Sequence, residues 1–309
     1  MGCLDDLLVK TSRTFALSVP LLPEPTRREV TTAYLLFRIA DTFEDAASWP
    51  REKRLKALAE FSSLLEEPSR GEAEASSSRW VAEKPIRHDG YLELLSEAPF
   101  VLQTFWQLDD PSRSILREHL QRTTRGMSSF VSRTRDSGEL TLRDLEDLRA
   151  YCYVVAGIVG EMLTELFLLG RESLVSVADY LRCRASRFGE GLQLVNIVKD
   201  TSRDLSEGRR YLPSGVSRAQ VFDLARQSLT CGAEYVIALQ GAGALRGVVA
   251  FNAMPLRLAW ATLDRVEEQG AGSKLTRPEV FALMEQMNGA LDRGEPAVPF
   301  APGGISEIT

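Results

Sequence analysis

Three oxygen-bearing side chains recur at intervals of four residues in the segment 193–213: Asn196, Asp200 and Asp204. In an α-helix, residues at this spacing share one face and rise about 6 Å per step, so the segment predicts a ladder of oxygen atoms. Carboxylate and amide oxygens are hard ligands that suit Mg²⁺. The spacing alone leaves a second interpretation open, a solvated acidic face paired with nearby basic residues: Lys199, Arg203 and Arg209.

A second acidic cluster repeats this design in the segment 34–45, where Asp41 and Asp45 are four residues apart and Glu44 stands beside them. Alone, it could be the solvated end of a helix. Two such clusters, each ending an apolar helical run with basic residues nearby, favour a functional pair, because burying unpartnered carboxylates costs several kcal/mol. The pair predicts a cavity lined from two sides that holds Mg²⁺ between carboxylates and a polyanion.

The sequence resembles the squalene and phytoene synthases, which join two prenyl diphosphates head to head. The resemblance runs from about Ser12 to about Leu263. It rests on ordered motifs: residues 12–15 (SRTF), 41–45 (DTFED), 151–160 (YCYVVAGIVG), 196–213 and 251–255 (FNAMP). The chain departs from the YCHYVAG segment of related squalene synthases at its third and fourth positions, where Tyr153 replaces His and Val154 replaces Tyr. The YC…VAG and FxAMP segments are most similar to squalene synthases.

The resemblance implies that two farnesyl diphosphates condense to presqualene diphosphate and then, with NADPH, to squalene. It assigns Mg²⁺ to both acidic clusters: Asp41, Glu44, Asp45, Asn196, Asp200 and Asp204. The cations expected to bind NADPH are Arg13, Arg38 and Lys199, with Lys274 or Arg277 as additions. Many relatives have Arg where this chain has Lys199, which keeps the charge and loses the bidentate geometry.

The resemblance also points to catalytic residues. Arg209 is expected to bind diphosphate oxygens, and either Tyr151 or the released diphosphate is expected to take up a proton. Phe15, Phe251 and Tyr34 could shelter cationic intermediates, and ordinary core packing explains these rings equally well.

Other functions remain open within and outside this family. The alternatives are a phytoene or dehydrosqualene synthase, or an enzyme that stops at presqualene diphosphate or at hydroxysqualene. A helical binding subunit without catalysis is a further alternative, against which the intact aspartates of both clusters count. The GxG of Gly241 and Gly243 does not predict a Rossmann site, because the third glycine is misplaced and no βαβ alternation follows.

Composition supports an acidic globular protein of 309 residues, with 44% hydrophobic and 26% charged residues. A net charge of −6 without a basic tail argues against nucleic acid as a partner. No signal peptide or hydrophobic C-terminal anchor is evident, and the apolar segment 151–169 contains Glu161 and Glu165, which would be costly in lipid. We therefore expect a cytoplasmic protein without a transmembrane segment, with peripheral contact at the inner face of a membrane as an option.

Helical periodicity dominates the chain, so we expect one all-α domain over residues 1–309. The resemblance adds the isoprenoid synthase fold, a helical bundle around a central cavity. A polar loop is expected over about 67–79 and a flexible tail over about 292–309, and Pro255 predicts a kink or break. The expected helices cover 4–18, 25–45, 51–66, 90–97, 99–108, 111–133, 141–170, 173–205, 217–240, 245–268 and 276–291.

Overall fold

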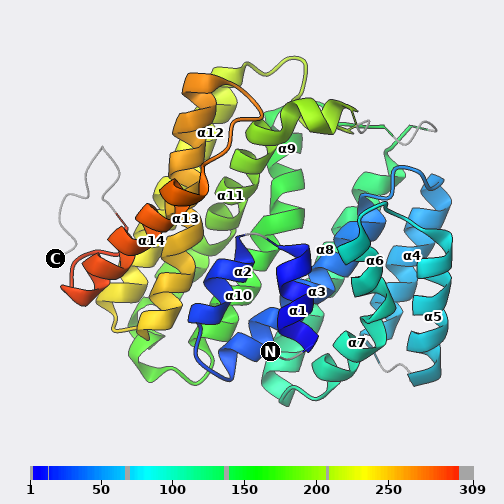
Figure 1. The fold of residues 1–309 in the computed structure, drawn as a ribbon, viewed down its shortest axis with the longest axis horizontal. Coiled ribbons are helices and arrows are strands. Elements are labelled where there is room, and N and C mark those ends of the chain that lie inside the picture. Colours follow the sequence, from blue (N-terminus) through cyan, green and yellow to red (C-terminus); the bar gives the residue numbers. More distant parts are fainter. Residues whose placement is uncertain (1–2, 13, 67–69, 136–138, 207–208, 299–309) are drawn as a thin grey trace. The chain divides into compact units, whose positions relative to one another are not determined.

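Helices make up nearly all the regular structure of the protein (Figure 1). The computed structural model describes residues 3–12, 14–66, 70–135, 139–206 and 209–298, without the side chains of 202–206. Within those ranges the regular extended structure is one parallel pair of two-residue strands, β1 (Leu140–Thr141) with β2 (Arg209–Arg210). The prediction of an all-α fold is confirmed.

Contacts divide the chain into two compact units, and each is described by itself. Unit 1 comprises Met1–Pro20, Glu24–Thr141 and Leu205–Arg210, and unit 2 comprises Leu21–Pro23, Leu142–Asp204 and Tyr211–Thr309. The prediction of a single domain around a central cavity stays a prediction.

Unit 1 is built around α3 (Thr26–Glu44), which contacts α1, α4, α6, α7 and α8. Its apolar residues are buried nearly all round, as expected for a helix with neighbours on several sides. Phe43, near its end, packs against Trp80 with ring centroids 4.7 Å apart. The other helices of the unit are α1 (Cys3–Thr11), α2 (Phe15–Ser18), η1 (Val19–Leu21, ending in unit 2), α4 (Arg51–Leu64), α5 (Arg70–Glu83), α6 (Asp89–Ser96), α7 (Ala98–Trp106) and α8 (Asp110–Ser132).

The predicted polar loop over 67–79 is wrong for its described part, because α5 covers residues 70–79. Its Glu and Ala residues have high helix propensity, and the segment's low hydrophobicity concealed a narrow buried stripe. Ala73, Ser77 and Trp80 lie on that stripe, and the hydroxyl of Ser77 donates to the carbonyl of Leu95 at 2.7 Å. Residues 67–69 lie outside the described residues.

Unit 2 begins with a helical run that the sequence predicted as one helix over 141–170. Thr141 is in β1, so Asp144 caps the helix instead and accepts the Asp147 N–H at 2.8 Å. A π-helical turn, η2 (Tyr153–Gly157), then interrupts the run. The helices of the unit are α9 (Leu145–Cys152), η2, α10 (Ile158–Leu168), η3 (Glu172–Val177), α11 (Ala178–Ser206, its last two residues in unit 1), α12 (Arg218–Gly241), α13 (Arg246–Gln269) and α14 (Arg277–Asp292).

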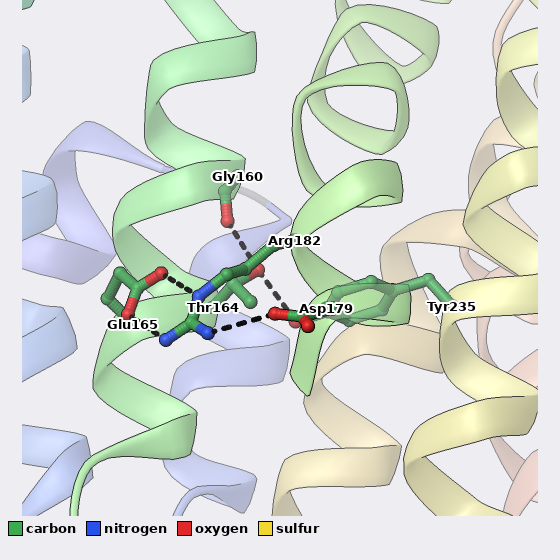
Figure 2. Close-up of polar contacts among 6 residues, drawn as sticks. All are labelled: Gly160, Thr164, Glu165, Asp179, Arg182 and Tyr235. Atoms are coloured by element: carbon green, nitrogen blue, oxygen red, sulfur yellow. Dashed lines mark hydrogen bonds and ion pairs between the residues drawn. The ribbon is translucent and has the colours of Figure 1, made fainter. Parts of the chain in front are cut away.

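Two glycines allow the continuous run of η2 and α10 to approach α11 closely. A Cβ on Gly160 would lie 2.2 Å from the carbonyl oxygen of Ala185, and one on Gly189 would lie 2.1 Å from that of Ala156. Polar contacts hold the pair near this crossing, where Arg182 of α11 forms an ion pair with Glu165 of α10 at 2.7 Å (Figure 2). These contacts fix the position of α11, the helix that carries the second acidic cluster.

The C-terminal part of unit 2 differs from expectation at two points. The helix α13 continues through Pro255 without a break. The segment 293–298, after α14, is fastened to α12, because Gln240 bonds the backbone of Glu295 and of Ala297, each at 2.8 Å. Ala297 and Val298 are buried, so the predicted flexible tail is wrong for 293–298. Residues 299–309 lie outside the described residues.

Candidate functional site

The first acidic cluster occupies the last turn of α3 and its cap. Asp45 ends the helix, and its N–H donates to the carbonyl of Asp41 at 2.8 Å. The carboxylate of Asp41 pairs with Arg38 at 3.1 Å, and that of Asp45 pairs with Arg209 of β2 at 2.6 Å. The Asp45 contact joins two motifs that are 164 residues apart in sequence.

The pKa values of this cluster show that its negative charge is poorly compensated. Loss of hydration raises the pKa of Asp41 to about 6, with Arg38 opposing the rise and Asp45 adding to it. Burial also raises the pKa of Glu44, whose carboxyl group lies near the charge of Asp45. A cation bound here would relieve the repulsion among these carboxylates.

Two residues near the cluster were missed by the sequence reasoning. Arg54 of α4 is 4% exposed, and its guanidinium donates to the carbonyl of Glu44. The ring of Tyr91, on α6, lies 5.4 Å from the guanidinium carbon of Arg38. Nothing in the local pattern marks either of them, since Arg54 lies in a highly charged helix that resembles a solvated face.

The second cluster lies on α11 in unit 2. The Lys199 ammonium donates to the Asn196 amide oxygen at 3.0 Å and pairs with the Asp200 carboxylate at 3.3 Å. Lys199 therefore supplies positive charge directly to the predicted ladder. The backbone of Asp204 continues this helix, and its side chain lies outside the described residues.

Two predicted NADPH-binding cations lie on adjoining segments. The N–H of Gly272 donates to the Lys199 carbonyl at 2.7 Å, and Lys274 follows two residues later. Gly270 and Gly272 have φ of +93° and +88°, a region that favours glycine, so the loop conformation depends on them. Arg277 opens the next helix, α14. Arg13 lies outside the described residues.

The Tyr151 hydroxyl donates to the Tyr211 hydroxyl at 3.0 Å, and the two rings stack with centroids 4.8 Å apart. Both residues are in unit 2 and are buried. Tyr211 was not singled out from the sequence, although it lies in the 196–213 motif. The pairing links this motif to the 151–160 motif and gives Tyr151 a partner through which a proton could pass.

The candidate aromatic residues are divided between the units. In unit 1, the rings of Phe15 and Tyr34 have centroids 5.2 Å apart, and the Tyr34 hydroxyl donates to the Thr11 carbonyl at 2.8 Å. In unit 2, Phe251 is buried and meets Phe167 edge to face at 5.8 Å. Each ring is held firmly, and a role for any of them in sheltering cations stays a prediction.

The oxygen donors of the two clusters fit Mg²⁺ in their chemistry. Among the described side chains, no three of His, Cys, Asp or Glu gather as a ready metal site. Mg²⁺ is usually held by one or two carboxylates with water and substrate phosphates, so a closed cage is not required. The oxygen donors and the raised carboxyl pKa values of the first cluster suit that mode of binding.

One helical run in the described part of the chain, Leu145–Leu168, is long and apolar enough to cross a membrane by length and composition. It spans α9, η2 and α10, and 44% of its most apolar window is buried. A core helix passes the same test, so this is weak evidence for a span.

Known proteins match the chain over most of its length. The squalene/phytoene synthase family model matches residues 8–281. A squalene synthase from Schizosaccharomyces pombe is 28% identical over 67% of this chain and 43% of its own, and one from Mus musculus is 29% identical over 68% and 45%. A lycopaoctaene synthase from Botryococcus braunii is 28% identical over 65% and 41%. The matches thus span less than half the length of these curated relatives.

Solved structures share the fold. A complex of TcSQS with the ligand BPH1237 superposes with a TM-score of 0.71 at 24% identity, covering 94% of this chain and 88% of the other. A dehydrosqualene synthase in complex with a ligand gives a TM-score of 0.59 at 19% identity, covering 94% and 95%. The chain therefore belongs to the squalene/phytoene synthase family. Members of this family are prenyltransferases.

Proposed function

We propose that the protein condenses two farnesyl diphosphates head to head to presqualene diphosphate and reduces that intermediate to squalene. The observation that carries the proposal is the acidic cluster at the end of α3, where desolvated carboxyl groups meet two arginines. Carboxylates and arginines together suit a metal-bound diphosphate. The carboxylates bind the metal cation, and the arginines bind the negatively charged diphosphate oxygens. The squalene synthase relatives support the C15 substrate.

The basic residues of the clusters would bind the leaving group. Arg38 and Arg209 each pair with one carboxylate in unit 1, and Lys199 does so in unit 2. Each can exchange that partner for a diphosphate oxygen, which stabilises the negative charge that develops as the C–O bond breaks. Asp41, Glu44 and Asp45, with Asn196, Asp200 and Asp204, would hold Mg²⁺, which supplies further positive charge to the leaving diphosphate.

The bond changes in the first stage require one proton acceptor. The allylic cation left by ionisation is attacked by a double bond of the second substrate, and loss of one proton closes the cyclopropane of presqualene diphosphate. The Tyr151–Tyr211 hydroxyl pair could relay this proton to the released diphosphate, each hydroxyl giving up its own proton as it takes one, or orient the diphosphate to accept the proton directly. An aromatic ring such as Phe251, which is buried, would help to keep water from adding to the cation.

The second stage requires a reductant. Lys199 and Lys274, on hydrogen-bonded segments of unit 2, would bind the phosphates of NADPH, with Arg277 at the start of α14. NADPH supplies the hydride that quenches the cation formed when the second diphosphate leaves. Arg38 and Arg13 were also predicted to bind it. Lys199→Ala is expected to lower the ratio of squalene to presqualene diphosphate more than it lowers total turnover.

A second candidate function comes from the relatives with other products. The lycopaoctaene synthase and the dehydrosqualene synthase have the same family or fold. A phytoene, dehydrosqualene or hydroxysqualene synthase, or one that stops at presqualene diphosphate, would use the same diphosphate chemistry.

The donor chain length can be tested by diphosphate release with Mg²⁺ and either C15 or C20 prenyl diphosphate. We expect rapid release from the C15 donor and slow release from the C20 donor. Preference for the C20 donor, with a polyene formed without NADPH, would make the protein a phytoene synthase. No Mg²⁺-dependent release from either donor would support a binding subunit without catalysis.

A further inference from the structure

The guanidinium of Arg38 contacts two tyrosine rings in unit 1. Its central carbon lies 5.7 Å from the centroid of Tyr34 and 5.4 Å from that of Tyr91. Tyr34 precedes Arg38 by one turn of α3, whereas Tyr91 comes from α6. A cation at this distance from an aromatic face is attracted by the electron density of the ring.

Both rings are anchored to the last residues of α1. The Tyr34 hydroxyl donates to the Thr11 carbonyl at 2.8 Å. Tyr91 follows Gly90, where a Cβ would lie 2.7 Å from the Lys10 carbonyl oxygen, so α6 and α1 meet backbone to backbone. An ion pair between Lys10 of α1 and Glu93 of α6, at 2.5 Å, is a second contact between these two helices. The position of Tyr91 is therefore set by helix packing and does not depend on Arg38.

The contact with the Tyr91 ring holds Arg38 without using its hydrogen-bond donors, whereas Tyr34 also forms a hydrogen bond with the guanidinium. One terminal nitrogen pairs with Asp41 at 3.1 Å. The Nε atom is buried and has no hydrogen-bond partner among the described residues, which is uncommon for a buried donor. Guanidinium has five N–H donors, and attraction to a ring face consumes none of them. The arrangement orients the group and leaves donors for an anion.

We propose that Tyr91 is a positioning residue that, with Tyr34, holds the Arg38 guanidinium ready to bind the diphosphate of the substrate. This inference rests on the proposed function, which supplies the diphosphate ligand. The competing interpretation is that Tyr91 only fills space between α6 and α3, which predicts a loss of stability without a change in anion affinity.

The test compares Tyr91→Leu, which removes the aromatic face, with Tyr91→Phe, which keeps it. Inorganic pyrophosphate with Mg²⁺ serves as the probe, both as a competitive inhibitor and in direct calorimetric binding. We expect Tyr91→Leu to raise the KM for farnesyl diphosphate and the pyrophosphate dissociation constant about fivefold to thirtyfold. For Tyr91→Phe, both constants should stay within about twofold of those of the parent protein. Tyr91→Met provides a second loss of the ring if Tyr91→Leu fails to fold.

Two controls separate positioning from packing. In an Arg38→Lys background, Tyr91→Leu should have little further effect on pyrophosphate affinity, because the geometry that it maintains is already lost. Tyr180→Leu removes another tyrosine–arginine stack, over Arg184 in unit 2, and should leave pyrophosphate affinity unchanged.

The proposal is overturned if Tyr91→Leu binds pyrophosphate like the parent, or if its effect is as large in the Arg38→Lys background. Failure of the proposed function has a different signature. In that case the parent protein would release no diphosphate from any prenyl donor, while calorimetry would still report whether Tyr91 affects pyrophosphate binding.

Discussion

Arginines from two other elements, β2 and α4, contact the last turn of α3. Arg209 pairs with Asp45 across 164 residues of sequence, and Arg54, on the next helix, donates to the Glu44 carbonyl. Because loss of hydration and mutual repulsion raise the carboxyl pKa values, this turn is costly for the fold as it stands. Residues kept at such a cost are candidates for function.

Substitution of single aspartates tests that inference. Asp41→Asn, Asp45→Asn, Asp200→Asn and Asp204→Asn should each lower diphosphate release by orders of magnitude, because each removes an oxygen ligand for Mg²⁺ or a partner of a diphosphate-binding cation. Asp41→Asn should leave the melting temperature unchanged or raised, since it removes a poorly hydrated charge. Asp179→Asn, at the solvent-exposed start of α11, is the matched control and should retain full activity. Normal turnover in any two of the four variants would refute the two-cluster model.

The Tyr151 hydroxyl supports a second prediction at this scale. Tyr151→Phe keeps the stacked ring and removes the donor to Tyr211, so a loss of about 10²-fold in kcat is expected if the hydroxyl takes part in proton transfer. Tyr235→Phe removes another buried hydroxyl of unit 2, which bonds Thr164 at 2.9 Å, and should affect stability only. Equal rates for Tyr151→Phe and the parent protein would show that Tyr151 serves only in core packing.

Sequence spacing identified residues that act within one helix more readily than residues that meet across helices. Asn196, Lys199 and Asp200 could be placed together because the helical period fixes their separation. The approaches of Arg54 and Tyr91 to the first cluster depend on how α4 and α6 pack on α3, which no local pattern encodes.

At the scale of elements, the crossing of α10 and α11 depends on two glycines. Gly160→Ala or Gly189→Ala would place a Cβ against a backbone oxygen that cannot move alone, so the helices must separate. We expect each to lower the free energy of unfolding by about 1–3 kcal/mol, measured by thermal or denaturant unfolding. Gly241→Ala, at the end of α12 with open space around it, is the control and should be neutral or stabilising. If the three variants were equally stable, close packing at the crossing would be contradicted.

The N-terminus of α14 supports a prediction on pH. Glu279 accepts the Thr276 N–H at 2.7 Å and pairs with Arg265, and these contacts lower its pKa to about 2. A lowered pKa in the folded state stabilises the fold above the unfolded pKa, and this stabilisation is lost as pH falls toward 2. Glu279→Gln should therefore lower the melting temperature near pH 7 and have a much smaller effect near pH 2. An equal effect at both pH values would contradict the ionic origin of the cap.

The positions of most helices could be predicted because their apolar residues recur with the helical period. The prediction of a loop over 70–79 was wrong because the Ser, Glu and Ala residues of this segment give it little hydrophobic pattern, while tertiary packing buries one side of the helix that it forms. The π turn at Tyr153 had no readable signal, since an extra residue in a turn leaves the apolar character of the run unchanged.

At the scale of the whole molecule, the chain passes five times between its two units, and the 196–213 motif is divided between them. Asp41 and Asp45 are in unit 1 with Arg209, whereas Asn196 and Asp200 are in unit 2 with Tyr151 and Tyr211. The sequence could predict that two acidic clusters exist and that Mg²⁺ and diphosphate suit both. It could not predict that Arg209, from the second motif, pairs with Asp45 of the first.

The central claim is a two-stage reaction, and product analysis with and without NADPH tests it most directly. The protein would be incubated with farnesyl diphosphate and Mg²⁺, and the products separated over time before and after NADPH is added. We predict that presqualene diphosphate accumulates first and is converted to squalene only when NADPH is present. Presqualene diphosphate that persists after NADPH is added, or a C30 polyene formed without it, would contradict the account.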